Sequence, residues 1–326
     1  MDKDDSVYNI NSRSYFKQLK KDIMSQKILI FMMLPGAILI FLFSYLPMFG
    51  IIVAFKQFSF GGKSFFENLF VMSKWVGLDN FKFFIKTPDA YTITRNTILY
   101  NIVFITFGNL VAIFCAIGLN EIRKGYLKRI YQSSMLLPYF LSWIVLSYLF
   151  FGFLSFDKGI FNSILVNILG TDAVNWYAEP KYWPYFIIFA NRLKYCGYDA
   201  IIYLATLTAI DITYYEAAII DGANKWKQII HITIPLLSPV MIILILYGIG
   251  RIFNADFGLF FNLPLDAGAL FDSTNVIDTY VYRSLRTNGD IAMASAAGLY
   301  QSVVGFVLVV TANSIVKKID PEKALF

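Results

Sequence analysis

Long runs of apolar residues alternate with short polar segments along the whole chain. The first run, Ile28 to Phe55, holds no charged residue. Comparable runs follow at about 97–119, 132–154, 184–208, 234–254 and 292–316. Each can cross the roughly 30 Å of bilayer hydrocarbon as a helix. Backbone amides in lipid must be paired within their own segment or a closed barrel, and these runs lack strand alternation. The pattern therefore predicts an all-α integral membrane protein with about six transmembrane helices.

The first run follows a basic segment, as the apolar core of a signal peptide would. It is longer than such a core and long enough to span the membrane. We therefore expect a retained first helix, kinked near Pro35 or Pro47.

Composition supports a membrane protein. Hydrophobic residues make up 57% of the chain and charged residues 15%, and a soluble domain of this length could not bury so much apolar surface. The net charge of +6 comes without a compact basic patch, which argues against nucleic-acid binding. Cys115 and Cys196 lie in apolar runs and are expected to be packing residues without a disulfide.

Basic residues indicate the orientation. Lys and Arg are denser in the segments that are cytoplasmic if the amino terminus is inside, and they are spread thinly over longer outer loops. The expected organisation is a cytoplasmic segment at 1–27, a transmembrane domain at 28–316 and a cytoplasmic tail at 317–326.

The most informative segment lies between the fourth and fifth runs. It reads Glu216-Ala217-Ala218-Ile219-Ile220-Asp221-Gly222, then nine residues, then Ile232-Thr233-Ile234-Pro235. Glu216 begins a short helix where the helix dipole favours an acid, and Gly222 allows a turn. A second short amphipathic helix, with Lys225 and Lys227 on its polar side, should end where Pro235 starts the next span. Residues 211–235 should thus form a compact cytoplasmic projection.

This pattern resembles the EAA motif of ABC importer permeases: E-A-A, three residues, G, nine residues, I-x-L-P. Only Ile234 departs from it, in place of Leu. Periodicity alone would favour an ordinary interfacial loop, whereas the full match favours the permease. The resemblance implies the type I ABC importer permease arrangement, with residues 211–235, here called the coupling loop, docking on a separate ATPase. The implied coupling residues are Glu216, Ala217, Ala218, Asp221, Gly222, Lys225 and Lys227.

Other segments are similar to the polysaccharide branch of the sugar-permease family, in the larger-partner position of the maltose transporter's heterodimer. They are 46–50, 75–81, 137–143, 276–283 and 302–305. This resemblance implies an oligosaccharide substrate and a bacterial cytoplasmic membrane with both termini inside. It also implies three protein partners: a second homologous permease, an ATPase dimer and an extracellular sugar-binding lipoprotein. ATP and Mg would bind the ATPase, with no cofactor on this chain.

The residues themselves argue against an enzyme. Gly62-Lys63-Ser64 is not a phosphate-binding loop, because Gln57 stands where its first glycine is required. His231 is the only histidine, so a catalytic triad would have to use this expected surface residue. No Cys/His cluster has metal-ligand spacing.

Polar residues inside spans mark either a cavity or a helix contact. Aromatic rings can stack on sugars, and amides or carboxylates can bind hydroxyl groups. The predicted substrate-path residues are Asn191, Tyr195, Tyr198 and Asp199, near one helix face, and Asn254 and Asp256, which follow Arg251. The alternative is that Lys194 and Asp199, or Arg192, pair within the bundle. The outer segments 56–95 and 256–290 are expected to contact the binding protein.

Two other classes of function remain as alternatives. An ATP-independent carrier or channel would be expected to show paired repeats with broken helices, and no internal repeat is evident. A membrane-embedded enzyme would need acid, base or metal groups that the sequence does not offer.

Overall fold

The computed structural model describes residues 24–83, 87–122 and 124–325. The chain divides into two compact units, Met1–Val53 and Ala54–Phe326. Most of the expected cytoplasmic segment 1–27 lies outside the described residues. The helical character predicted for the apolar runs is confirmed in both units.

One long helical stretch, which changes geometry along its length, makes up the described part of the first unit and continues to Phe55. α2 (Lys27–Ile40) has Pro35 inside it. A wide π-helical turn, η1 (Phe41–Tyr45), follows, and then the tighter 3₁₀ segment η2 (Leu46–Phe55). α2 thus runs through Pro35, and the helix type changes after Ile40 and again at Leu46, next to Pro47.

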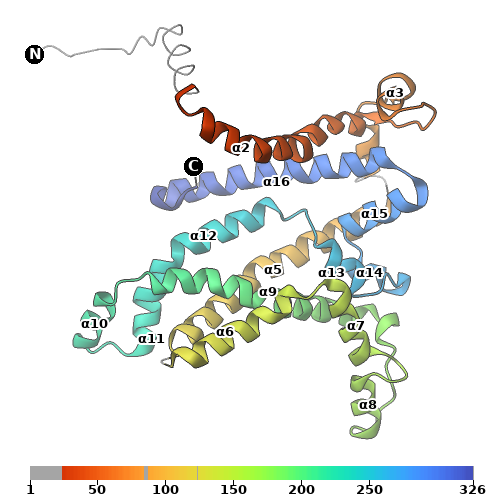
Figure 1. Cartoon of the computed structure of the whole chain (residues 1–326). Coiled ribbons are helices and arrows are strands. Elements are labelled where there is room, and N and C mark those ends of the chain that lie inside the picture. Colours follow the sequence, from red (N-terminus) through yellow and green to blue (C-terminus); the bar gives the residue numbers. More distant parts are fainter. Residues whose placement is uncertain (1–23, 84–86, 123, 326) are drawn as a thin grey trace, which may run out of the picture. The chain divides into compact units, whose positions relative to one another are not determined.

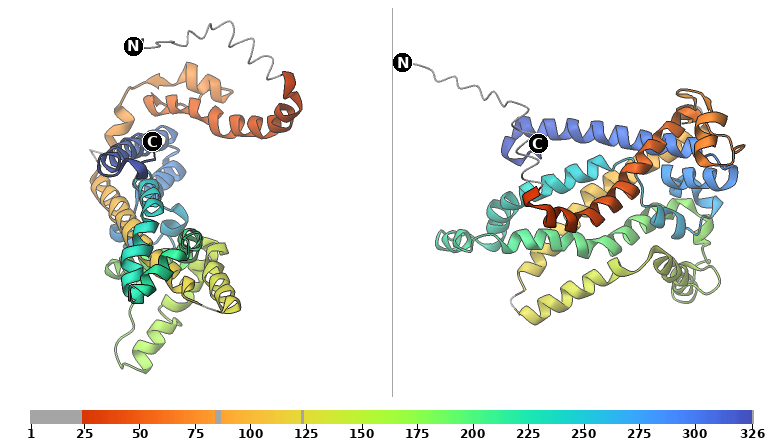
Figure 2. Two further views of the ribbon diagram at one scale, coloured as in Figure 1. Left: turned by 90° about the vertical axis from the view of Figure 1, so that its left-hand side faces the viewer. Right: turned by 45° about the horizontal axis from the view of Figure 1, so that its top comes forward.

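The second unit is built from helices that lie side by side (Figures 1 and 2). Its longer helices are α5 (Pro88–Asn120), α6 (Gly125–Phe140), α7 (Trp143–Leu154), α9 (Trp183–Thr208), α12 (Ile234–Gly250), α15 (Ile277–Asn288) and α16 (Ile291–Ile319). Its shorter helices are α3 (Phe65–Glu67), α8 (Ile160–Asn167), α10 (Thr213–Ile220), α11 (Lys225–Gln228), α13 (Phe257–Asn262) and α14 (Phe271–Thr274). The π-helical turns are η3 (Asn68–Met72) and η7 (Ile229–Thr233), and the 3₁₀ turns are η4 (Asp79–Lys82), η5 (Trp176–Ala178), η6 (Pro180–Tyr182), η8 (Gly268–Leu270) and η9 (Pro321–Lys323).

A short hairpin precedes the bundle. β1 (Lys56–Gln57) pairs antiparallel with β2 (Lys74–Trp75), with Lys56 opposite Trp75.

Packing between helices produces two main cores. α5 lies against α9, α6 also packs on α9, and α12 packs on α16. One core gathers large rings around the fully buried Trp183, including Trp143 and Phe260. The other joins α5 to α9 through small residues such as Ala116 and Ala200. There the sulfur atoms of Cys115 and Cys196 are 3.5 Å apart, and both cysteines are free.

The expected count of six spans is not confirmed. Among the described residues, four helical stretches are long and apolar enough to cross a membrane: Lys27–Phe55, Asp89–Asn120, Lys225–Gly250 and Ile291–Ile319. A fifth is reached if α6 and α7 form one bent span. α9 has the length of a span, but every stretch of 18 residues within it contains Arg192, Lys194 and Asp199.

The third run, 132–154, does not form one straight helix as its hydropathy suggested. α6 and α7 meet at an angle of 98°. Ser142 caps α7 by accepting a hydrogen bond from the Val145 N–H, which starts a new helix there. The Lys194 ammonium donates to the carbonyl of Tyr139 (3.0 Å) and to that of Leu141, so the opened backbone is not left unsatisfied.

The fifth run also ends earlier than expected, at Gly250 rather than near residue 254. The end of α12 meets α16 at close range: a side chain on Gly305 would collide with the carbonyl oxygen of Gly250. Gly305 stands midway between Ile291 and Ile319, the ends of α16. α12 therefore stops at half the height of the neighbouring span.

Candidate functional site

The coupling loop begins with α10, which carries Glu216, Ala217 and Ala218. Glu216 lies in the first turn, where the helix dipole favours its charge. Before the helix, the carboxylate of Asp211 accepts a hydrogen bond from the Thr213 N–H, which lowers the pKa of Asp211 below its ordinary value.

A glycine turn ends α10. Asp221 is the C-cap residue of α10. Gly222 follows it with a φ of +76°, in the left-handed region that favours glycine. The Gly222 N–H donates to the carbonyl of Ile219, and the Ala223 N–H donates to that of Ala218 at 2.8 Å. These two bonds define a Schellman motif. The predicted turn at Gly222 therefore has a specific backbone cause.

The second short helix, α11, begins at once. The Asn224 side chain caps it by accepting a hydrogen bond from the Lys227 N–H at 3.0 Å. Lys225 and Lys227 are both exposed.

The next helix starts where expected, because α12 begins at Ile234 with Pro235 in its first turn, but no break separates it from α11. Helical structure continues from Lys225 through η7 and α12 to Gly250. Proline fixes a helical φ and removes only one donor, and η7 changes the hydrogen-bond spacing just before the ring. The coupling loop is thus continuous with the membrane helix that follows it.

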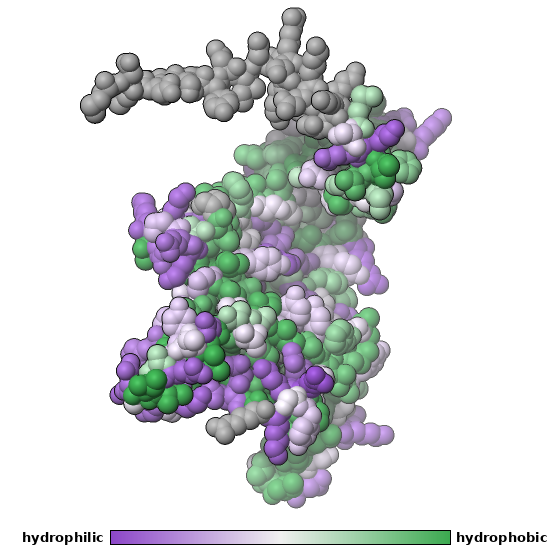
Figure 3. Space-filling view, turned by 60° about the vertical axis from the view of Figure 1, so that its left-hand side comes forward, coloured by the Kyte–Doolittle hydropathy of each residue, from purple (hydrophilic) through white to green (hydrophobic). Residues whose placement is uncertain are grey.

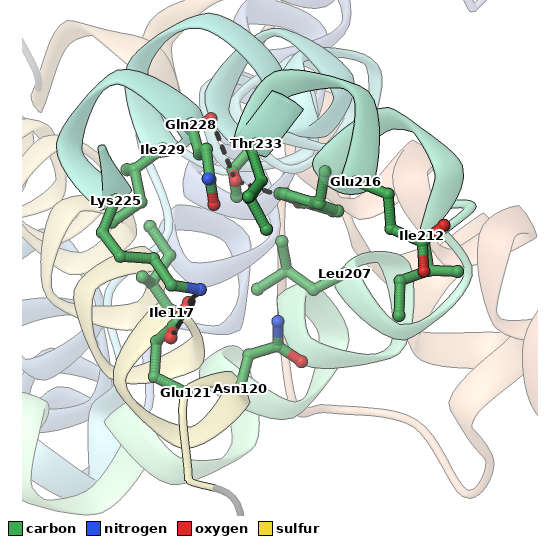
Figure 4. A pocket seen from close by; sticks show the side chains of 12 residues that line it. Ile117, Asn120, Glu121, Leu207, Ile212, Glu216, Lys225, Gln228, Ile229 and Thr233 are labelled. Carbon is green, nitrogen blue, oxygen red and sulfur yellow. Dashed lines mark hydrogen bonds and ion pairs between the residues drawn. The ribbon is translucent and has the colours of Figure 1, made fainter. Parts of the chain in front are cut away.

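Polar contacts hold the coupling loop together and to the bundle. The hydroxyl groups of Tyr215 and Thr233 are 3.0 Å apart, and Gln228 Nε2 donates to the Ala223 carbonyl at 3.1 Å. Lys225 Nζ lies 3.0 Å from Glu121, the residue at the end of α5 (Figure 4). The loop therefore has an internal hydrogen-bond network and an ion pair to another membrane helix.

A cavity of about 440 Å³ separates the coupling loop from the ends of α5 and α9. The side chains of Asn120, Glu121, Leu207 and Glu216 border it (Figure 4). α10 therefore lies beside a hollow rather than against a filled core.

Apolar side chains are exposed on the coupling loop. Ile219, Ile220 and Trp226 are 61%, 86% and 71% exposed. Figure 3 looks toward this end of the molecule, where hydrophilic residues gather with a small hydrophobic group among them. An apolar patch rimmed by polar residues is typical of a protein interaction site.

The predicted substrate-path residues separate into distinct environments. Asp256 Oδ2 accepts hydrogen bonds of 2.8 Å from both Tyr195 and Trp143. Tyr198 is half-exposed, and its ring stacks on Tyr139 with centroids 4.7 Å apart. The structure therefore brings Tyr195 and Asp256 together, although they come from different runs.

The other predicted path residues have structural partners. Asp199 lies 3.5 Å from Arg192, so the alternative of pairing within the bundle holds for this carboxylate. Asn191 is buried and accepts a hydrogen bond from Arg192. The backbone carbonyl of Asn254 accepts a hydrogen bond from Asn101 at 3.0 Å.

Sequence reasoning missed Trp143 and Tyr139 as members of this polar and aromatic group. Both stand in the segment 137–143, where a proline followed by a serine within an apolar run could have indicated a helix break. Lys194 belongs with them, because it holds the break together.

No group of three or more His, Cys, Asp and Glu side chains that could hold a metal occurs in the part of the chain that the structure describes. His231 is exposed, with Nδ1 3.0 Å from the Lys227 carbonyl oxygen.

Comparisons with known proteins agree with this architecture. Residues 108–322 match the family model described as "Binding-protein-dependent transport system inner membrane component". The protein LplB of Bacillus subtilis (strain 168) is 33% identical over 311 residues, which cover 95% of this chain and 93% of LplB. The polygalacturonan/rhamnogalacturonan transport system permease protein YteP of the same organism is 32% identical, covering 94% of this chain and 92% of YteP.

A solved structure extends the likeness to three dimensions. It is a chain of a bacterial ABC transporter involved in the import of the acidic polysaccharide alginate, with a TM-score of 0.81 and 30% identity. The match covers 93% of this chain and 99% of that one. A second match, also with a TM-score of 0.81, is a chain of the bacterial alginate ABC transporter in complex with an alginate pentasaccharide-bound periplasmic protein. The chain is an all-α, multi-pass membrane protein with the type I ABC importer permease fold, and it belongs to the family of binding-protein-dependent transport system inner membrane components.

Proposed function

We propose that this chain is one of two permease subunits of an ATP-driven importer of oligosaccharides in a bacterial cytoplasmic membrane. Family membership supports the transport role, and the saccharides named for YteP and for the alginate transporter support the substrate class. The second subunit would be a homologous permease, and both termini would lie in the cytoplasm.

The observation that carries the proposal is the form of the coupling loop. Two short helices joined at Gly222 present Ile219, Ile220 and Trp226 to solvent. Burying this patch in a groove of an ATPase subunit would remove apolar surface from water. Glu216, Ala217, Ala218, Asp221, Gly222, Lys225 and Lys227 are the proposed coupling residues, and ATP with Mg would bind the ATPase.

Substrate would pass along the polar and aromatic residues of the spans. Tyr195 and Asp256, joined by a hydrogen bond, and Tyr198, stacked on Tyr139, support such a path. Asn191, Asp199 and Asn254 complete the proposed set. An extracellular sugar-binding lipoprotein would dock on the outer segments 56–95 and 256–290.

The docking proposal is tested by replacing Ile220 with Glu in the full transporter. A charged group on the apolar patch should release the ATPase during purification and abolish saccharide uptake. The matched control is Ile168→Glu, because Ile168 is similarly exposed at 74% but stands after α8, far from the coupling loop along the chain. Retention of the ATPase by the Ile220 variant would contradict the proposal.

A further inference from the structure

Arg251 lies at mid-height of the membrane domain. It follows Gly250, whose carbonyl meets Gly305 at the middle of α16. α16 has 29 residues, enough to cross a bilayer, so its middle marks the level of the bilayer midplane. Arg251 therefore brings a permanent positive charge to that level.

The side chain of Arg251 is on the free face of α12. It is exposed, and its Nη1 donates a hydrogen bond of 2.9 Å to the hydroxyl of Tyr247, one turn earlier. Tyr247 is itself 61% exposed, and the guanidinium carbon lies 5.8 Å from its ring centre. Leu246 is buried and Gly248 packs on Ile105, so the opposite side of the helix meets the bundle.

The other cations at membrane depth are already engaged. Arg192 is paired with Asp199, and Lys194 donates to two backbone carbonyls. Within the described residues, Arg251 forms no ion pair, although its charge acts at longer range on the buried carboxylate of Asp278. An exposed charge at this depth is unfavourable against hydrocarbon, so it is expected to face a water-filled path. An exposed cation on such a path that has no ion-pair partner attracts an anionic ligand.

We propose that Arg251 and Tyr247 form a binding platform for acidic sugars, and that the transported oligosaccharide carries uronate carboxylates. The planar guanidinium can bind a carboxylate through two parallel hydrogen bonds, a geometry that lysine cannot reproduce. The exposed tyrosine ring offers a flat surface to the adjoining sugar ring. This inference rests on the proposed function and narrows its substrate class.

The test uses the complete transporter in proteoliposomes, with its second permease, ATPase and binding protein. Oligomers of galacturonate, glucuronate, mannuronate and guluronate are each compared with the carboxyl-reduced, neutral form of the same oligomer. At least one uronate oligomer should be taken up, and its neutral form should enter about tenfold more slowly or worse. Arg251→Gln should lower uptake of the uronate oligomer by about tenfold. Arg251→Lys, which keeps the charge but not the paired hydrogen bonds, should lower it less.

Arg129→Gln is the matched control, because Arg129 is an exposed arginine near the start of α6. It should transport at the wild-type rate. Preferred uptake of a neutral oligosaccharide, unaffected by Arg251→Gln, would overturn the inference while leaving the proposed function intact. Loss of the second permease from the Arg251 variant would also overturn it, by placing this side chain in a subunit contact. Failure to take up any saccharide, acidic or neutral, by the assembled wild-type transporter would refute the proposed function itself.

Discussion

The ammonium group of Lys225 lies 3.0 Å from the carboxylate of Glu121, so an ion pair joins the coupling loop to the end of α5. Both side chains are substantially exposed, and such pairs contribute only about 0–1 kcal/mol to stability. We expect the ion pair to matter through its position, because it joins the coupling loop to α5 at the edge of the cavity beside α10.

The first prediction concerns this pair. Glu121→Lys should weaken the coupling of ATP hydrolysis to transport by placing two cations together, with little effect on thermal stability. The double variant Glu121→Lys with Lys225→Glu should restore coupling, since it rebuilds the pair in reverse. Uptake per ATP hydrolysed in proteoliposomes is the measurement. If the reversed pair behaves no better than the single variant, the contact has no role in coupling.

The second prediction concerns Gly222. Gly222→Val places a branched side chain at φ of +76°, at a cost of about 1–2 kcal/mol, and disrupts the Schellman turn. The ATPase should be lost during purification and substrate-stimulated hydrolysis should disappear. Gly222→Asn should be milder, because asparagine tolerates this conformation.

Gly289→Val supplies the control for backbone strain. Gly289 has a similar φ of +66° but ends α15, outside the coupling loop. This variant should lose stability and still retain the ATPase. Equal ATPase retention by the Gly222 and Gly289 variants would show that the turn is not a docking element.

The third prediction concerns Glu216. Glu216→Lys reverses the charge in the first turn of α10 and removes a favourable dipole interaction of about 0.3–1 kcal/mol. We expect weaker ATPase binding with normal membrane insertion, measured by co-purification at increasing salt. Glu216→Gln should be intermediate. Wild-type retention by the lysine variant would exclude a role for this charge.

The fourth prediction concerns Lys194 and the break between α6 and α7. Lys194→Met keeps much of the side-chain volume but leaves the Tyr139 and Leu141 carbonyls without their ammonium donor. An unsatisfied buried acceptor costs about 1–3 kcal/mol, and these two partly buried carbonyls should cost less, so the melting temperature in detergent should fall modestly. Lys194→Arg, which keeps the charge, should be less destabilised. Equal melting of both variants would mean that the charge does not hold the bend.

The fifth prediction tests the proposed substrate path. Tyr195→Ala and Asn254→Ala should lower uptake and substrate-stimulated ATP hydrolysis while assembly continues, since each lost contact with a sugar is worth about 1 kcal/mol. Tyr195→Phe separates the ring from the hydroxyl group that donates to Asp256. Wild-type transport by both alanine variants would place the path elsewhere.

The apolar segments predicted a helical membrane protein, and the fold confirms this. The prediction was reliable because backbone groups in lipid can be paired in few ways. The turn at Gly222 was predictable because only local backbone chemistry is needed there. The bend after Phe140 was not predictable from hydropathy, since the run 132–154 remains apolar across it. Its stabilisation comes from Lys194, which is distant in sequence.

Side-chain pairing inside the bundle was equally hard to predict. Both Arg192 and Lys194 precede Asp199 on the same helix, and periodicity left either pairing open. The structure pairs Arg192 with Asp199, and Lys194 instead binds carbonyls of α6 and of the break that follows it. Trp143 and Asp256 are 113 residues apart, so only tertiary packing reveals their hydrogen bond.

The unbroken helical run from Lys225 to Gly250 has a mechanical consequence. No loop interrupts the run, and it changes direction between α11 and α12 (Figure 1). A displacement of Trp226 would therefore be transmitted along the helix to its end beside Arg251. The stiffness of the π-helical turn η7 would then determine how much of that displacement reaches the centre of the membrane.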